Sequence, residues 1–294
     1  MSARRRSRFR TVFVWGGYTL AALLLLAATG IFAGSEWILR RHHDVALQPL
    51  RPTALAFDNA EGRRRAVIIG CLKGCHGPEG EGGTEKASRI FSATAPTLTA
   101  VLPTYSDAEL LRLVRFGIKR EGTSAVGMPA YTFYPMSDDE LALIFRHLRQ
   151  RPALPAVPRH RRVFPLGRLA LVLGKWKVSA DHVDPTAPRW GELPRTTPSE
   201  RGRYTASVTC SECHGVDFKG LPYFPSPSLA IVNGYYVEQF RRLLRTGEHL
   251  SGRTDGMMAD LARAAFTEFT DQEIDDLYVF LSSTFADAGL PAGR

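Results

Sequence analysis

The sequence predicts an all-α protein in which an N-terminal transmembrane helix precedes two tandem helical domains. Three observations support this fold class. Residues 11–35 carry no charge, apolar residues recur at helical spacing downstream, and the second half of the chain repeats the motif order of the first. At 294 residues the chain is long enough for two domains. Its balanced apolar and charged fractions suit globular folding.

The N-terminal segment combines a basic tail with a long uncharged run. Residues 1–10 hold five arginines, and residues 11–35 exceed the about 20 apolar residues that cross a bilayer. The apolar part is also longer than the about 7–15 residues of a signal-peptide core. Because arginines precede the run, the positive-inside rule predicts a single-pass anchor with a cytoplasmic N-terminus and the domains across the membrane. A signal peptide cleaved near Ala27 and Ala28 is the alternative, and it would export the domains as well.

Two cysteine-histidine motifs indicate the chemistry. Residues 210–214 read Cys-Ser-Glu-Cys-His, the signature of c-type haem attachment. Residues 71–76 have the same parts with one extra residue between the cysteines. In such motifs the two thiols form thioethers with the haem and the histidine gives the iron its proximal ligand. The predicted attachment residues are Cys71, Cys75, Cys210 and Cys213, and the predicted proximal ligands are His76 and His214. These motifs use all four cysteines, so none remains for a disulfide.

Each copy then follows the same order of elements. The repeated segments are Pro96-Thr97-Leu98 with Pro227-Ser228-Leu229, residues 114–117 with 244–247, and residues 137–141 with 270–274. The predicted helices are 60–71, 107–116 and a last helix after Ser137 in the first copy, and 199–210, 237–244 and a last helix after Thr270 in the second. Both last helices open with a capping box, since Glu follows the Ser or Thr by three residues. The repeat therefore predicts one module used twice.

The loop after the second helix of each copy supplies a candidate distal iron ligand. The interval from Gly117 to Met128 equals the interval from Gly247 to Met258. Thioether sulfur favours ferrous iron and raises the haem potential, so Met128 and Met258 are predicted to ligate the iron. Met257 remains an alternative to Met258, because the following loop is three residues longer in this copy.

Other methionines and histidines are assigned structural roles. Met136 corresponds to Phe269 in the repeat, as expected of an apolar residue that packs on the helix it precedes. The histidines outside the motifs are predicted to be solvated surface residues: His42, His43, His147, His160, His182 and His249. His147 is placed on the polar side of its helix. His249 is kept as a further candidate ligand, because it follows Gly247 by two residues.

The segment between the domains has a distinct composition. Residues 152–198 hold eight prolines, which predicts extended or irregular chain rather than a third domain. Within it, residues 163–176 are unusually apolar but too short to span a bilayer. Packing across the two domains is one interpretation, and docking to the membrane surface or to a partner subunit is the other. The predicted organisation is a basic tail (1–10), an anchor (11–35), a linker (36–58), domain 1 (59–151), a linker (152–198), domain 2 (199–284) and a C-terminal tail (285–294).

With these motifs in place, the chain resembles membrane-anchored dihaem cytochromes c with two class I-type domains, similar to the cytochrome subunits that accompany periplasmic dehydrogenases and oxidases. The resemblance covers about residues 59–150 and 199–283. It implies two tandem cytochrome c-type helical domains and two covalently bound haem c groups with their iron. It also implies that Pro96 and Pro227 lie beside the proximal histidines. The sequence departs from the family in the three-residue cysteine spacing and in the lack of a proline after Met258.

These features together predict an electron carrier rather than an enzyme, and no catalytic residue is assigned. The expected location is the bacterial inner membrane with the haem domains in the periplasm. The expected partners are a dehydrogenase, a quinol-oxidising complex or a terminal oxidase. A dihaem oxidoreductase or peroxidase with one open haem site is the alternative. Nucleic-acid binding is not predicted, because +5 of the formal charge of +9 comes from the N-terminal arginines and no basic-aromatic recognition motif is present.

Overall fold

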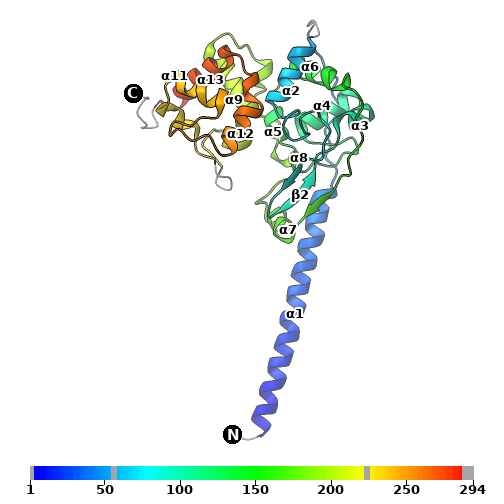
Figure 1. The fold of residues 1–294 in the computed structure, drawn as a ribbon. Helices are drawn as coiled ribbons and strands as arrows, with labels where there is room; N and C mark the ends of the chain where they lie inside the picture. Colours follow the sequence, from blue (N-terminus) through cyan, green and yellow to red (C-terminus); the bar gives the residue numbers. More distant parts are fainter. Residues whose placement is uncertain (1–2, 54–57, 222–225, 287–294) are drawn as a thin grey trace.

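The computed structural model describes residues 3–53, 58–221 and 226–286 and is mostly helical, which confirms the all-α fold class. The long helix α1 (Ala3–Arg40) projects from a globular part in which two helical bodies lie side by side (Figure 1). We call residues 59–151 module 1 and residues 199–284 module 2. Small elements from the segment between the modules lie near the base of module 1, next to the upper end of α1.

Helix α1 has the length and surface of a membrane span. Its 38 residues rise about 57 Å, and large apolar side chains such as Phe13 and Leu24 are exposed along it. Among the described residues it is the one helix that is long and apolar enough to cross a bilayer. One side of the last turn of α1 is covered, since Leu39 is 3% exposed.

The predicted linker 36–58 begins as helix and then lies along module 1. The residues directly after α1 are held to the globular part: Arg41 forms an ion pair with Asp181, and the His43 amide donates to the Gly122 carbonyl over 2.9 Å. Further along, the Thr53 amide donates to Asp139 over 2.6 Å. The described part of this segment therefore lies against the globular part and is held there by these contacts.

Module 1 contains a helical core and a small sheet. Its elements are α2 (Asn59–Ile68), β1 (Glu85–Ala87), β2 (Phe91–Thr94), α3 (Leu98–Val101), η1 (Leu102–Thr104), α4 (Asp107–Phe116), α5 (Ala130–Phe133) and α6 (Asp138–Arg149). The Asp58 side chain caps α2 and a Ser106–Glu109 capping box starts α4. Gly117, with φ of +67°, ends α4 in the left-handed conformation that favours glycine.

Module 2 repeats this helical order. Its elements are α9 (Pro198–Thr209), α10 (Ser211–His214), η3 (Leu229–Gly234), α11 (Val237–Thr246), α12 (Met257–Ala264), η4 (Phe266–Glu268) and α13 (Asp271–Thr284). The predicted capping box at Thr270–Glu273 is complete. The one at Ser137–Glu140 is only half formed: Ser137 accepts the Glu140 amide, but the Glu140 carboxylate turns instead to Arg65. The apolar residues before both helices, Met136 and Phe269, are buried as predicted.

The first and last helices of each module cross at a glycine. A Cβ on Gly62 of α2 would lie 2.6 Å from the Leu143 carbonyl oxygen of α6. A Cβ on Gly202 of α9 would press still closer on the Asp276 carbonyl oxygen of α13. In both helices an alanine that is 0% exposed, Ala66 or Ala206, follows four residues later. Small residues at i and i+4 thus let the helix backbones approach closely in both modules.

The segment 152–198 differs from the predicted irregular linker. It contains β3 (Arg161–Val163), α7 (Pro165–Val172), α8 (Ser179–His182) and η2 (Trp190–Glu192). Strand β3 completes an antiparallel sheet of order β1-β2-β3, with Phe91 opposite Val163. Part of the apolar stretch inside the segment is packed against the protein, because Trp176 stacks on Phe91 with 5.2 Å between ring centroids and α7 packs on α1. The prolines separate these short elements without preventing them from folding onto module 1.

Candidate haem sites

In module 2 the cysteine-histidine motif continues a helix. Helix α9 runs up to Cys210, and α10 carries the rest of the motif to His214. The His214 amide donates to the Cys210 carbonyl over 2.9 Å, as in one turn of α-helix. The spacing of two residues between cysteines therefore places Cys210, Cys213 and His214 on a single tight turn.

In module 1 the extra residue opens this turn into a loop. Helix α2 ends at Ile68, Gly70 adopts φ of +77°, and Lys73 adopts φ of +56°. A left-handed conformation is uncommon for a residue with a side chain. The loop is nevertheless ordered by packing and hydrogen bonding, because Leu72 is 1% exposed and the Cys75 amide donates to the Gly70 carbonyl over 3.0 Å.

Despite this difference, both histidines meet the same kind of partner. His76 Nδ1 lies 2.9 Å from the Pro96 carbonyl oxygen, and His214 Nδ1 lies 2.8 Å from the Pro227 carbonyl oxygen. A carbonyl oxygen only accepts, so Nδ1 carries the ring proton and the lone pair is on Nε2. This is the tautomer that a metal-binding imidazole uses, with its other nitrogen held by the protein. The structure thus places Pro96 and Pro227 beside the histidines, as the resemblance implied.

The carbonyl groups of the two histidines are held in the same way. The Gly82 amide donates to His76 O and the Gly220 amide donates to His214 O, each over 2.8 Å. Gly82 and Gly220 have φ of +76° and +87°. A Cβ at Gly220 would lie 2.6 Å from the Ser226 carbonyl oxygen, so a side chain would disturb this loop.

The four cysteines are partly buried at these turns. Burial raises the pKa of Cys71 to about 12 and that of Cys210 to about 11, so these two thiols stay protonated at neutral pH. The first cysteine of each motif also packs on the hydrophobic core. Within the described part of the chain, no group of three His, Cys, Asp or Glu side chains is placed to hold a metal by itself.

The candidate distal ligands lie on equivalent loops. The turn in which the Lys119 amide donates to Thr123 O corresponds to the turn in which the His249 amide donates to Arg253 O. His249, the further candidate ligand, thus occupies the position of Lys119. Beyond the turns, Met128 and Met258 are both half-buried and pack on the hydrophobic core.

Met257 and Met258 differ in their surroundings. The Met257 side chain is 59% exposed. Met258 is half-buried, and Ala259, which follows it, is 0% exposed. Gly127 precedes Met128 and Gly256 precedes Met257, both with positive φ, so the glycines alone would align Met128 with Met257. Burial favours Met258, because a ligand to a buried iron must face the core.

One repeated interaction was not anticipated from the sequence. Arg115, buried at the end of α4, donates to the Met136 carbonyl over 2.7 Å and pairs with Asp138 over 2.7 Å. Arg245, at the same place in α11, donates to the Phe269 carbonyl over 2.6 Å and pairs with Asp271 over 2.8 Å. The signal was present as an arginine two residues before the helix-ending glycine in both copies. Each arginine fixes the end of the methionine loop to the start of the last helix.

The residues around each motif fit a covalently bound haem. Two sulfurs, an imidazole with its lone pair on Nε2 and a methionine thioether on the same core are the donor set of a c-type centre. Cys71, Cys75, His76 and Met128 would hold the group in module 1, and Cys210, Cys213, His214 and Met258 would hold it in module 2. When bound, haem iron supplies one-electron redox chemistry. The protein's contribution is attachment, ligand orientation and a low-dielectric surrounding.

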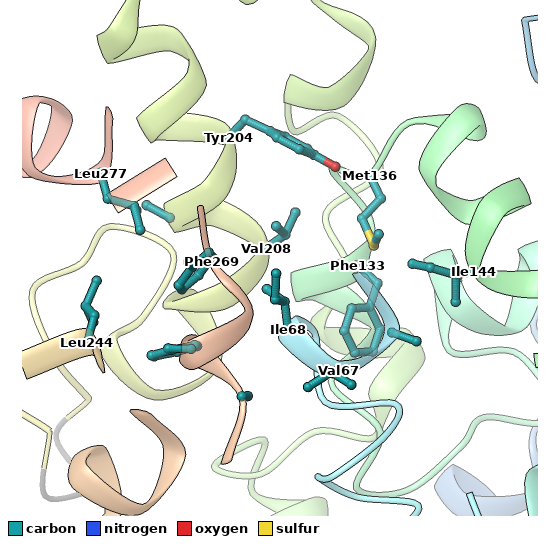
Figure 2. Close-up of a cluster of buried hydrophobic side chains, with 14 of the residues drawn as sticks. Val67, Ile68, Phe133, Met136, Ile144, Tyr204, Val208, Leu244, Phe269 and Leu277 are labelled. Atoms are coloured by element: carbon teal, nitrogen blue, oxygen red, sulfur yellow. The ribbon is translucent and has the colours of Figure 1, made fainter. Parts of the chain in front are cut away.

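The surroundings of the two motifs touch one another. Ile68 of α2 and Val208 of α9 precede the first cysteines and lie in one buried cluster with residues of both modules (Figure 2). The Tyr131 hydroxyl, three residues after Met128, lies 3.3 Å from the Glu212 carbonyl inside the second motif. Conversely, Nζ of Lys73, inside the first motif, lies 3.7 Å from Oε1 of Glu268 in η4 of module 2. The interface between the modules is thus built at the two motifs.

A charged cluster borders this interface. Arg65 donates to Glu140 over 2.8 Å, Arg64 donates to Glu273 over 2.7 Å, and the Tyr204 hydroxyl donates to Glu140. Glu140 and Glu273 are equivalent in the repeat, but their surroundings differ. Burial raises the pKa of Glu140 and outweighs the attraction of Arg65. At Glu273 burial is opposed by the hydrogen bond from Arg64, and the pKa falls below its ordinary value of 4.5.

The histidines outside the motifs are mostly bonded to their neighbours, and one prediction was wrong. His147 was expected on the solvated side of α6, but it is 6% exposed and its Nδ1 lies 2.7 Å from Asn59 Oδ1. The α2–α6 crossing covers it, an effect that helical periodicity alone does not reveal. His182 stacks on Tyr131 with 5.4 Å between ring centroids, and His160 bonds Ser92 and Thr94 through its two ring nitrogens.

Comparison with known proteins adds one finding. Residues 199–285 match the family model described as cytochrome c. Module 2 is therefore a cytochrome c domain, a kind of domain that carries covalently bound haem c and supports haem-based electron transfer. A search of curated proteins found no match to the chain.

Proposed function

We propose that the chain is a membrane-anchored dihaem c-type cytochrome that transfers electrons between periplasmic or membrane redox partners. The cytochrome c domain at residues 199–285 is the premise. To this the proposal adds a second haem in module 1, a membrane anchor in α1 and an electron relay between the modules. The partner classes remain a dehydrogenase, a quinol-oxidising complex or a terminal oxidase.

The single observation that carries the second haem is the geometry of His76. Its Nδ1 lies 2.9 Å from the Pro96 carbonyl, which reproduces the 2.8 Å contact between His214 and Pro227 in the cytochrome c domain. A cysteine-rich loop without haem would have no need of this tautomer-fixing contact. The matching placement of Met128 and Met258 on the core supports the same interpretation.

The relay is supported by the interface between the modules. Electron tunnelling weakens steeply with distance, so a relay needs the two centres to be neighbours. Ile68 and Val208 share one buried cluster, and the Tyr131 contact with Glu212 joins the distal loop of module 1 to the motif of module 2. Direct packing at both motifs is the arrangement that short-range transfer requires.

Haem counting tests the second centre. The purified full chain is expected to hold two haems, and each of two matched double variants is expected to hold one: Cys71→Ala with Cys75→Ala, and Cys210→Ala with Cys213→Ala. Mass spectrometry of the denatured chains measures covalent haem directly. A wild-type chain with one haem, located in module 2, would contradict the second centre while leaving the cytochrome c domain in place.

Carbon monoxide binding separates the relay from the alternative enzyme. If Met128 and Met258 cap both irons, the reduced protein should bind carbon monoxide slowly and to a small extent at either centre. Fast binding at one iron per chain would contradict the capped relay. That result would instead favour an oxidoreductase or peroxidase with one open haem site.

A further inference from the structure

Helix α7 exposes an apolar stripe that a soluble protein would cover. Leu166, Leu169 and Leu173 are 54%, 37% and 60% exposed. They follow one another at spacings of three and four residues, so they share one face of the helix. The opposite face is filled, since Leu171 is 3% exposed and Gly167 packs directly on the Ile90 backbone. Both faces of the helix are therefore apolar, and one of them faces outward.

The position of α7 relative to α1 indicates the environment of this exposed apolar face. Arg168 donates to Ser35 Oγ and to Glu36 Oε1, each over 2.8 Å, and its guanidinium lies 4.2 Å from the Phe32 ring centroid. These contacts fall where the uncharged run of α1 ends. Figure 1 shows α7 beside the upper end of α1, at the base of the globular part.

Aromatic residues on α1 mark the same level. Trp15 and Trp37 are 68% and 65% exposed, and the helix rises about 33 Å from one to the other. This matches a hydrocarbon core of about 30 Å, and tryptophan favours the membrane–water boundary on both sides. Trp37 follows the residues that α7 contacts, so α7 lies at the level of the outer boundary.

A groove beside α7 combines apolar walls with cations. It measures about 370 Å³ and lies between the end of α1 and the segment after α7. Its walls include Trp37, Ile38, Leu171 and Trp176, with Arg41, Lys177 and Asp181 at the polar side. Arg41 is paired with Asp181, and Lys177 is exposed. Phospholipids, which have an anionic phosphate in the head group and apolar acyl chains below it, match this combination.

We propose that α7 is an interfacial membrane helix, whose stripe of Leu166, Leu169 and Leu173 lies in the outer leaflet at the head-group boundary. Helices that lie at the membrane interface are held there by burial of apolar side chains and by nearby cations, which here are Arg41 and Lys177 beside α7. The inference rests on the proposed anchoring by α1. It adds a second contact with the bilayer, which would fix the tilt and rotation of module 1 about α1.

Site-directed spin labelling in vesicles tests this placement. In the holoprotein the native cysteines are consumed in thioethers, so single cysteines can be labelled at chosen sites. The variants are Leu169→Cys and Leu173→Cys on the stripe, Leu24→Cys inside the span and Val279→Cys as a control. Val279 is an apolar residue, 42% exposed, on α13 of module 2. The full-length protein is placed in phosphatidylcholine vesicles without added reductant, and collision with oxygen is compared with collision with a water-soluble nickel chelate.

The inference expects the labels at 169 and 173 to collide several-fold more with oxygen relative to nickel than the label at 279 does. It is overturned if the label at 24 is in lipid while the labels at 169 and 173 behave like that at 279. Protection that appears only after a partner protein is added would also overturn it, in favour of a protein interface. If the label at 24 is itself in water, the anchor of the proposed function fails instead.

Discussion

The two modules place their histidines alike but reach that placement by different routes. In module 2 helix α9 passes through Cys210 into α10, and one helical turn carries the whole motif. In module 1 the extra residue breaks the helix, and Lys73 takes a left-handed conformation in the resulting loop. Yet His76 and His214 contact their proline carbonyls over nearly the same distance, 2.9 Å and 2.8 Å.

This difference shows which contacts define the histidine position. The cysteine turn varies, whereas the proline carbonyl, the glycine amide on the histidine carbonyl and the crossing of the first and last helices are common to both modules. The loop with the proline therefore sets the imidazole, and the cysteine spacing adapts to it.

The helix crossings should differ most in their tolerance of added volume. Gly202→Ala places a methyl group into the Asp276 backbone, whereas Gly62→Ala makes a less severe contact with Leu143. Overpacking of a tight contact costs about 1–3 kcal/mol, so Gly62→Ala should lie in this range and Gly202→Ala at or above its upper end. Gly234→Ala is the matched control, because an added Cβ there meets nothing within 4 Å. Denaturant unfolding measures all three, and equal losses for Gly202→Ala and Gly234→Ala would refute the tight crossing.

The methionine loops should respond alike at Met128 and Met258 and differ at Met257. Loss of the thioether in Met128→Ala or Met258→Ala should lower the potential of one haem, within the about 0.8 V range that axial ligands command. It should also open one iron to carbon monoxide. Met257→Ala should change neither, because its side chain is mostly exposed. Potentiometric titration checks this, and a shift in Met257→Ala with none in Met258→Ala would reverse the assignment.

The equivalent glutamates should give opposite pH profiles. The raised pKa of Glu140 means that its stabilisation, relative to Glu140→Gln, is fully present below pH 4.5 and is lost as pH rises through its folded pKa. The lowered pKa of Glu273 means that its stabilisation, relative to Glu273→Gln, is present above pH 4.5 and is lost as pH falls through its folded pKa. Each trend should amount to about 1.4 kcal/mol per unit of pKa displacement. Unfolding free energies measured from well below pH 4.5 up to neutral pH provide the comparison, and parallel trends would contradict it.

The smallest effect is expected at Lys73. Glycine adopts the left-handed conformation without penalty, so Lys73→Gly should relieve strain of about 1 kcal/mol. Glycine also raises the conformational entropy of the unfolded chain, and the substitution removes the contact with Glu268. Both effects should offset part of this gain. A net change within about 0.5 kcal/mol, with haem content unaltered, is the expected outcome. A large loss of haem from module 1 would show that Lys73 itself shapes the attachment loop.

The sequence was most informative where the repeat supplied two observations of one feature. The matching intervals to Met128 and Met258 and the paired helix caps could be predicted because each was seen twice. At Gly62 and Gly202 the sequence shows a glycine four residues before an alanine. Only the backbone contacts in the structure reveal that two helices cross closely at these glycines. The burial of His147 depends on a neighbouring helix, which periodicity within one helix cannot supply.

The segment after module 1 was harder to predict for a different reason. Its prolines are typical of irregular chain, but the apolar stretch around Trp176 had no visible partner in the sequence. That partner is Phe91, far earlier in the chain, together with the end of α1. Each such pairing occurs only once and joins segments that are far apart in the sequence. Neither a repeat nor a local periodicity therefore predicts it.

The direct junction between α1 and module 1 governs how such a protein could meet its partners. A flexible tether of about 20 residues would let a tethered carrier range over roughly 25 Å and shuttle between separate docking sites. Here Arg41 and His43 bind the globular part immediately after the helix ends. With the proposed anchoring, the cytochrome would keep one height above the bilayer, and its encounters would depend on two-dimensional diffusion of the whole molecule. Only partners whose docking face reaches that height could exchange electrons with it.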